Sequence, residues 1–155
     1  MNEAKPQRSQ RQQWMAVLAR ASSAELDAIV ERLGGLPRHT ILKPAATGTV
    51  MVEARAGGAG RRFNLGEATM TRCVIRLADS HDTIGFAYAL GTDRHKAVVC
   101  AVLDALLLQP HTGPELHATE IAPLAARQSA ARDLASRKAA RTKVNFFSLV
   151  RGHDG

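Results

Sequence analysis

The spacing of apolar residues predicts two helices near the start of the chain. The first is expected to begin near Ser9 or Gln10, and its apolar side is a cluster formed by Trp14, Met15, Val17 and Leu18. Ser22 and Glu25 form the Ser-x-x-Glu capping box of a second helix, whose apolar stripe consists of Leu26, Ile29, Val30 and Leu33. Residues 1–8 show no apolar periodicity, so we expect them to be disordered.

The middle of the chain changes to the two-residue period of β-strands. Residues 40–43 are β-prone, although Pro44 weakens that segment, and strand patterns follow at 49–55, at 61–65 with its continuation 69–77, and at 83–90. In the third pattern Thr71, Cys73, Ile75 and Leu77 lie opposite Met70, Arg72, Val74 and Arg76. Because turn-forming residues separate these segments, they predict an antiparallel meander of about four strands.

A helix is expected to cover this meander. Asp93 is a suitable cap, and the apolar face that follows predicts a helix to about Leu108 that lies on the sheet. Residues 110–114 contain two prolines and a glycine and indicate a loop. A further helix, rich in alanine and basic residues, is expected to begin at Pro123 and to reach Arg141.

The last part of the chain is predicted to bind other proteins. Residues 144–150 are expected to form a strand or an ordered peptide, and we interpret 123–152 as an extended segment that binds a partner. The complete prediction is one α+β domain, residues 1–155. It has two N-terminal helices, a meander covered by a helix, a basic C-terminal helix and a terminal strand.

Charge and composition narrow the function only slightly. The net charge of +7 and the isoelectric point near 10.2 attract polyanions of any kind. Aromatic residues make up 4% of the chain, so the core is thin and its stability is expected to depend partly on partners. Cys73 and Cys100 are expected to be free thiols in the core, which with the absence of a long apolar segment predicts a cytoplasmic protein.

A glycine-rich loop beside two arginines is a candidate anion site. Gly58 and Gly60 supply a flexible backbone, and Arg61 and Arg62 supply guanidinium groups that could contact phosphate. The chain continues as a strand rather than a helix, which matches neither of the common phosphate-binding motifs, so a plain hairpin loop is the alternative. Arg72 is a further candidate contact for an anion or substrate.

The basic helix is a candidate partner interface. Arg137, Lys138 and Arg141 share one side of it with Leu134. A solvated surface, an acidic protein partner and nucleic acid are the three interpretations, and the scarcity of aromatic residues counts against single-stranded nucleic acid. We also expect Phe146 and Phe147 to anchor in a neighbouring protein chain, because a short aromatic segment beyond a weakly apolar helix has little core to join.

No residue pattern specifies catalysis. The histidines do not form the helical pairs that bind metals, and neither cysteine nor any serine lies in a nucleophile motif. We therefore expect no catalytic residue, no metal site and no cofactor bound by this chain. A nucleic-acid-binding module and a free-standing small enzyme remain open on the residues alone.

Several short motifs nevertheless occur in an order that resembles a known family. They are Trp14-Met15-x-Val17-Leu18, Gly57-Gly58-x-Gly60-x-Arg62-Phe63, then Gly66, Thr69, Thr71 and Arg72, then Gly85, Leu90-Gly91-x-Asp93, Val144-x-Phe146-Phe147 and Val150-Arg151-Gly152. From about residue 12 to residue 152 the chain resembles the family of G subunits of the bacterial carbon-phosphorus lyase core complex. Each motif is weak alone, and the order and spacing carry the resemblance.

The resemblance implies a role within a hetero-oligomer. The complex, with its H, I and J subunits, would make ribose 1-alkylphosphonate 5-triphosphate from its substrates ATP and a phosphonate, with release of adenine. In the family the nucleosidase chemistry is associated with the I subunit and the radical iron-sulfur step with the J subunit. The expected partners are therefore these three proteins, rather than nucleic acid or a membrane.

Overall fold

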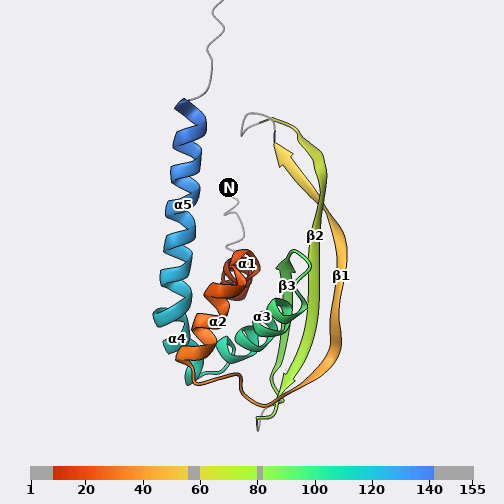
Figure 1. Cartoon of the computed structure of the whole chain (residues 1–155), viewed down its shortest axis with the longest axis vertical. Coiled ribbons are helices and arrows are strands. Elements are labelled where there is room, and N and C mark those ends of the chain that lie inside the picture. The colour runs from red at the N-terminus through yellow and green to blue at the C-terminus, as the bar shows by residue number, and fades with distance from the viewer. Residues whose placement is uncertain (1–8, 56–59, 80–81, 142–155) are drawn as a thin grey trace, which may run out of the picture.

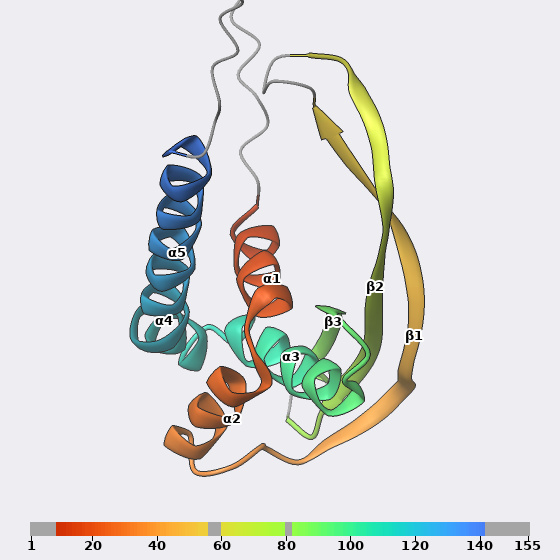
Figure 2. The same cartoon turned by 45° about the horizontal axis from the view of Figure 1, so that its top comes forward.

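In the described part of the chain, all helices lie on one side of a three-stranded antiparallel sheet (Figures 1 and 2). The structure, a computed structural model, describes residues 9–55, 60–79 and 82–141. The strands β1 (His39–Arg55), β2 (Arg62–Leu77) and β3 (Ile84–Leu90) are ordered β1-β2-β3. This arrangement confirms the predicted α+β class. The predicted strand of residues 144–150 lies outside the described part of the chain, as do residues 1–8.

The described meander has three strands rather than the expected four. The segments 40–43 and 49–55 belong to the single strand β1, which continues through Pro44. Pro44 is tolerated because β1 is an edge strand and its register with β2 shifts between Lys43 and Ala46. A proline at a bulge on an edge strand removes no hydrogen bond that the ladder needs.

Helix α3 (Arg94–Leu107) packs closely against one face of the sheet, as predicted. The Asp93 side chain caps it by accepting a hydrogen bond of 3.0 Å from the Lys96 N–H. The closest approach is at Gly85, where a Cβ atom would overlap the carbonyl oxygen of Ala101 and lie 2.9 Å from the Ala105 methyl. The absence of a side chain at Gly85 therefore sets the distance between α3 and β3.

The strand β3 turns its small residues toward α3 and its large apolar residues away from it. Gly85, Ala87 and Ala89 are buried under the helix. Cross-strand pairing gives the outward rows of β2 and β3, which consist of the pairs Met70 with Leu90, Arg72 with Tyr88, Val74 with Phe86 and Arg76 with Ile84. On β2 the predicted alternation is confirmed, since Thr71, Cys73, Ile75 and Leu77 are buried.

The N-terminal helices α1 (Gln10–Arg20) and α2 (Ser23–Arg32) begin at the predicted positions. Ser9 caps α1, and Ser22 forms the expected reciprocal capping box with Glu25. The apolar side of α1 is buried at Trp14, Val17 and Leu18, and that of α2 at Leu26 and Ile29. The predicted stripe of α2 is wrong at its end, because Leu33 forms the C-cap and is 39% exposed.

A buried carboxylate joins α1, α3 and β3. The side chain of Asp104, on α3, is fully buried and accepts bonds from Arg11 Nη2 at 2.7 Å, Arg11 Nε at 3.2 Å and Trp14 Nε1 at 2.8 Å. It also accepts a bond of 2.9 Å from the Phe86 N–H. That N–H belongs to an edge strand and would otherwise lack a ladder partner, so Asp104 also satisfies one outward N–H of β3.

The C-terminal helical region is longer than predicted. Helix α4 (Thr112–Leu116), the π-helical turn η2 (His117–Ile121) and α5 (Ala122–Arg141) follow one another directly. The expected loop at 110–114 is wrong in part, because Pro114 lies in the first turn of α4, where its missing N–H has no function. The π-helical turn ends two residues before Pro123, whose ring would clash with the carbonyl four residues earlier in a regular α-helix.

We predict that Gly85→Ala destabilises the protein, because the added methyl meets the backbone of α3 rather than a flexible side chain. Overpacking of this kind costs about 3 kcal/mol in the free energy of unfolding. Urea denaturation of the purified protein measures it. Gly48→Ala is the matched control, since Gly48 lies in the same sheet and a Cβ atom added there would meet no other atom within 4 Å. Equal stabilities of the two variants would contradict the close packing.

We predict that Asp104→Asn lowers the free energy of unfolding by roughly 2 to 3 kcal/mol, because an amide cannot accept all the hydrogen bonds of the carboxylate. Asp133→Asn, at an exposed position of α5, should change it by less than about 0.5 kcal/mol. Thermal and chemical denaturation provide the measurement. The interpretation of Asp104 as a structural centre is wrong if both variants are as stable as the parent.

Candidate functional site

The arginines of the predicted anion loop lie at the far end of the β1–β2 hairpin. Gly60, Arg61 and Arg62 are exposed there, while Gly58 lies outside the described residues. Arg62 pairs with Glu53 of β1 at 3.5 Å, an exposed contact that contributes little stability. A guanidinium group has five N–H donors, so this single contact leaves others able to bind an anion.

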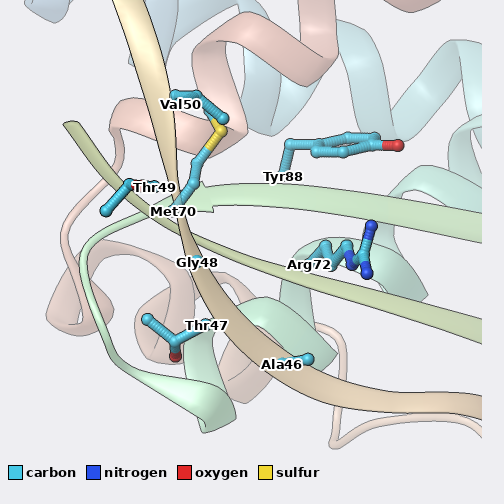
Figure 3. A pocket seen from close by; sticks show the side chains of 8 residues that line it. All are labelled: Ala46, Thr47, Gly48, Thr49, Val50, Met70, Arg72 and Tyr88. Atoms are coloured by element: carbon cyan, nitrogen blue, oxygen red, sulfur yellow. The ribbon is translucent and has the colours of Figure 1, made fainter. Parts of the chain in front are cut away.

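Arg72 does not lie with the other two arginines. Ten residue steps along β2 separate it from Arg62, which at 3.3 Å per step is about 33 Å. Arg72 instead borders a shallow hollow of about 300 Å³, together with Met70, Tyr88 and Val50 (Figure 3). One small ligand therefore cannot contact both groups of candidate residues at once.

The hairpin continues well beyond the three-stranded part of the sheet. Strand β3 pairs with residues 70–76 of β2, so residues 49–55 and 62–69 form a ribbon of two strands alone. Large apolar side chains are exposed on this ribbon, including Phe63, Met51 and Leu65, the last being 65% exposed. An isolated two-stranded ribbon is only marginally stable in water, so a partner protein that packs against this ribbon would stabilise it.

Helix α5 projects from the body of the protein in the same direction as the ribbon (Figures 1 and 2). Leu124 is fully buried, but every residue from Ser129 to Arg141 is exposed. The exposed residues include Arg137, Lys138 and Arg141, and Leu134 is 48% exposed. Phe146 and Phe147 follow this helix in the sequence and lie outside the described residues.

The outward face of β2 and β3 is a further surface, one that the sequence reasoning did not single out. We define this open sheet face as Met70, Arg72, Val74, Arg76, Ile84, Phe86, Tyr88 and Leu90. Tyr88 is 51% exposed, and Ile84, Phe86 and Leu90 are also exposed. A contiguous, largely apolar surface of this kind on a folded domain typically marks a protein–protein interface. The sequence signal for this surface was the alternation of four large residues along β3. That alternation alone did not show that they are exposed, because the same residues could equally have faced the core.

The cysteines are structural residues, as predicted. Both are buried free thiols, and burial raises the pKa of Cys100 to about 12 and also raises the pKa of Cys73. Each thiol therefore stays protonated at neutral pH and is a poor nucleophile. Among residues 9–55, 60–79 and 82–141, no three histidines, cysteines or carboxylates are grouped to bind a metal ion. No helix in this part of the chain is long and apolar enough to span a membrane.

Comparison with known proteins identifies the family. Residues 9–152 match the family model described as phosphonate metabolism protein PhnG. The chain is also similar to alpha-D-ribose 1-methylphosphonate 5-triphosphate synthase subunit PhnG of Rhizobium meliloti (strain 1021), with 36% identity over 146 residues. This alignment covers 94% of the chain and 92% of the relative, and it confirms the resemblance inferred from the motifs. The chain belongs to the PhnG family of phosphonate metabolism proteins.

Proposed function

We propose that this chain is a subunit of a complex that synthesises ribose 1-methylphosphonate 5-triphosphate during phosphonate catabolism. In this role it supports transfer of the ribose triphosphate moiety of ATP to an alkylphosphonate, with release of adenine. Family membership and the named relative support the proposal. The transferase chemistry belongs to the assembled complex, and the isolated chain is inactive.

The observation that carries this proposal is the exposure of the second half of α5. The part of this 20-residue helix from Ser129 onward is exposed at every residue and gains almost nothing from tertiary packing. Most helical stability in proteins comes from packing an apolar face, and Leu134 offers such a contact to a partner. Basic residues around it favour an acidic surface on that partner.

We further propose that the partners are the H, I and J subunits of the carbon-phosphorus lyase complex and that assembly takes place in the cytoplasm. The two free thiols are suited to a reducing compartment. The ribbon and α5 extend toward the same end of the molecule, so they can engage one neighbouring protein together (Figure 2). We assign Phe146 and Phe147, which follow Arg141 in the sequence, to the same contact.

Co-expression with the H, I and J subunits, followed by size-exclusion chromatography and mass analysis, tests the proposal. We predict that the chain co-elutes with them and that Arg137→Glu/Lys138→Glu/Arg141→Glu lowers the affinity about tenfold or more, because the charge reversal repels an acidic partner. Phe146→Ala/Phe147→Ala should weaken assembly in the same assay.

Arg94→Glu is the control for charge, since Arg94 is exposed at the start of α3, away from α5. Its co-elution should match that of the parent chain. A chain that elutes alone as a monomer, or that turns over substrate alone, would contradict the proposed role. Unchanged assembly of the α5 and phenylalanine variants would show instead that the complex uses other surfaces.

The exposed hairpin end is our candidate contact for the triphosphate or phosphonate. We predict that Arg61→Ala/Arg62→Ala weakens ATP binding by the assembled complex about tenfold, because charge-assisted bonds to phosphate are lost. Isothermal titration calorimetry on the purified complex provides the measurement, with Arg94→Ala as the control. If ATP affinity and phosphonate utilisation are both unchanged, the loop is a structural hairpin turn.

A further inference from the structure

We propose that the open sheet face binds an acidic amphipathic helix from another protein of the same complex. This inference rests on the proposed function, since it names one surface through which the chain joins its complex. The face comprises the outward rows of β2 and β3, and Figures 1 and 2 show that no helix of residues 9–55, 60–79 and 82–141 lies on that side of the sheet. The bound helix would form the layer that the described chain itself does not provide.

The two rows of the face differ in chemistry. The row on β3 is entirely apolar or aromatic and consists of Ile84, Phe86, Tyr88 and Leu90. The row on β2 alternates between apolar and cationic residues, in the order Met70, Arg72, Val74 and Arg76. Two hollows, of about 300 and about 160 Å³, lie on this face, and residues of β1, β2 and β3 line both. They adjoin each other, since Arg72 and Tyr88 border both. These hollows can receive side chains of a docked element.

The charges indicate what kind of surface fits there. Lys43 of β1 borders the smaller hollow beside Arg72, and within the described residues no carboxylate pairs with Lys43, Arg72 or Arg76. On the other flank, the guanidinium of Arg11 lies 5.2 Å from the centre of the Phe86 ring, but its charge is already paired with Asp104. The cations without a carboxylate partner thus lie along one side of the apolar row, which complements a helix with an apolar stripe and carboxylates on one flank of that stripe.

The dimensions of the face agree with one helix. The row from Ile84 to Leu90 spans six residue steps, or about 20 Å. A helix of about 14 residues has the same length, since it rises 1.5 Å per residue. The rows of adjacent strands are about 4.8 Å apart, so a helix about 10 Å wide covers both β2 and β3.

The same charges disfavour the other occupants. A second copy of this chain placed face to face would bring two cationic rows into one interface, and neither face carries a carboxylate to pair with them, which is unfavourable. A nucleotide or nucleic acid would satisfy the cations, but it would leave most of the apolar row on β3 in water. An acidic amphipathic helix satisfies both parts of the surface at once.

The test uses the co-expressed complex in which the chain carries a photo-crosslinking amino acid in place of Tyr88. After irradiation, mass spectrometry should identify crosslinks to an acidic, helix-forming segment of another protein in the complex. The same crosslinker at Leu108, a similarly exposed residue at the far end of α3, is the matched control and should not reach that segment. This experiment leaves the rest of the chain unchanged, so it does not depend on how well charge variants fold.

Charge reversal provides the second measurement. Arg72→Glu/Arg76→Glu should weaken association with the protein that carries the crosslinked segment by about tenfold or more, while Arg94→Glu has no effect. Circular dichroism and thermal melting establish that the variants are folded.

Crosslinks from position 88 to a second copy of this chain, or no crosslinks to another protein of the complex, would overturn the inference. Unchanged association of the folded charge-reversal variant would also overturn it, as would loss of association that ATP or inorganic phosphate alone reproduces by competition. In each of these outcomes a wild-type chain that still co-elutes keeps the proposed function intact. A wild-type chain that does not assemble would overturn both.

Discussion

A carboxylate removed from water is costly unless its oxygens are fully hydrogen-bonded, and the side chain of Asp104 meets this condition only in the folded arrangement. Its donors come from α1 (Arg11 and Trp14) and from β3 (the Phe86 N–H), whereas Asp104 itself lies on α3. Three elements distant in sequence must therefore be placed correctly together. In a core with few aromatic residues, this directional requirement selects one packing of the N-terminal helix against the sheet.

The same packing determines which side of the sheet remains available. Because α3 approaches the backbone at Gly85, only small residues fit beneath it, and the large side chains of β3 must face the opposite direction. The helices then gather on one side, and the apolar row on β3 stays exposed. The surface that we assign to a partner is thus a direct consequence of how closely the covering helix packs. The exposed half of α5 and the β1–β2 ribbon are two further elements that are packed only weakly within the described part of the chain.

The features that were predicted correctly from the sequence depend on neighbouring residues. The starts of α1, α2 and α3 follow from Ser9, Ser22 and Asp93, whose side chains bond to N–H groups within three residues. Alternation along β2 likewise reports burial directly. The resemblance to the family was found in the same way, from short motifs in a fixed order, and the comparisons confirm it.

The features that were missed depend on tertiary contacts. Pro44 reads as a strand breaker until its place on an edge strand is known. Asp104 reads as an ordinary polar residue of an amphipathic helix, because its partners lie far away in sequence. Nothing in the alternation of β3 states which set of residues is covered, since that choice depends on α3. The candidate arginines at positions 62 and 72 lie on one strand, but only its extended length shows that they are far apart.

The π-helical turn η2 affects how the orientation of α5 could change during evolution. A π-turn holds one residue more than the α-helical turn it replaces, so it offsets the residues that follow by about 100° around the helix axis. Loss or gain of a single residue in 117–121 would change this offset and rotate the side of α5 that carries Leu134 and its basic neighbours. The orientation of that side is thus encoded by a length of chain rather than by a contact. Insertions and deletions there would change the direction in which this side of α5 faces without altering any residue of its surface.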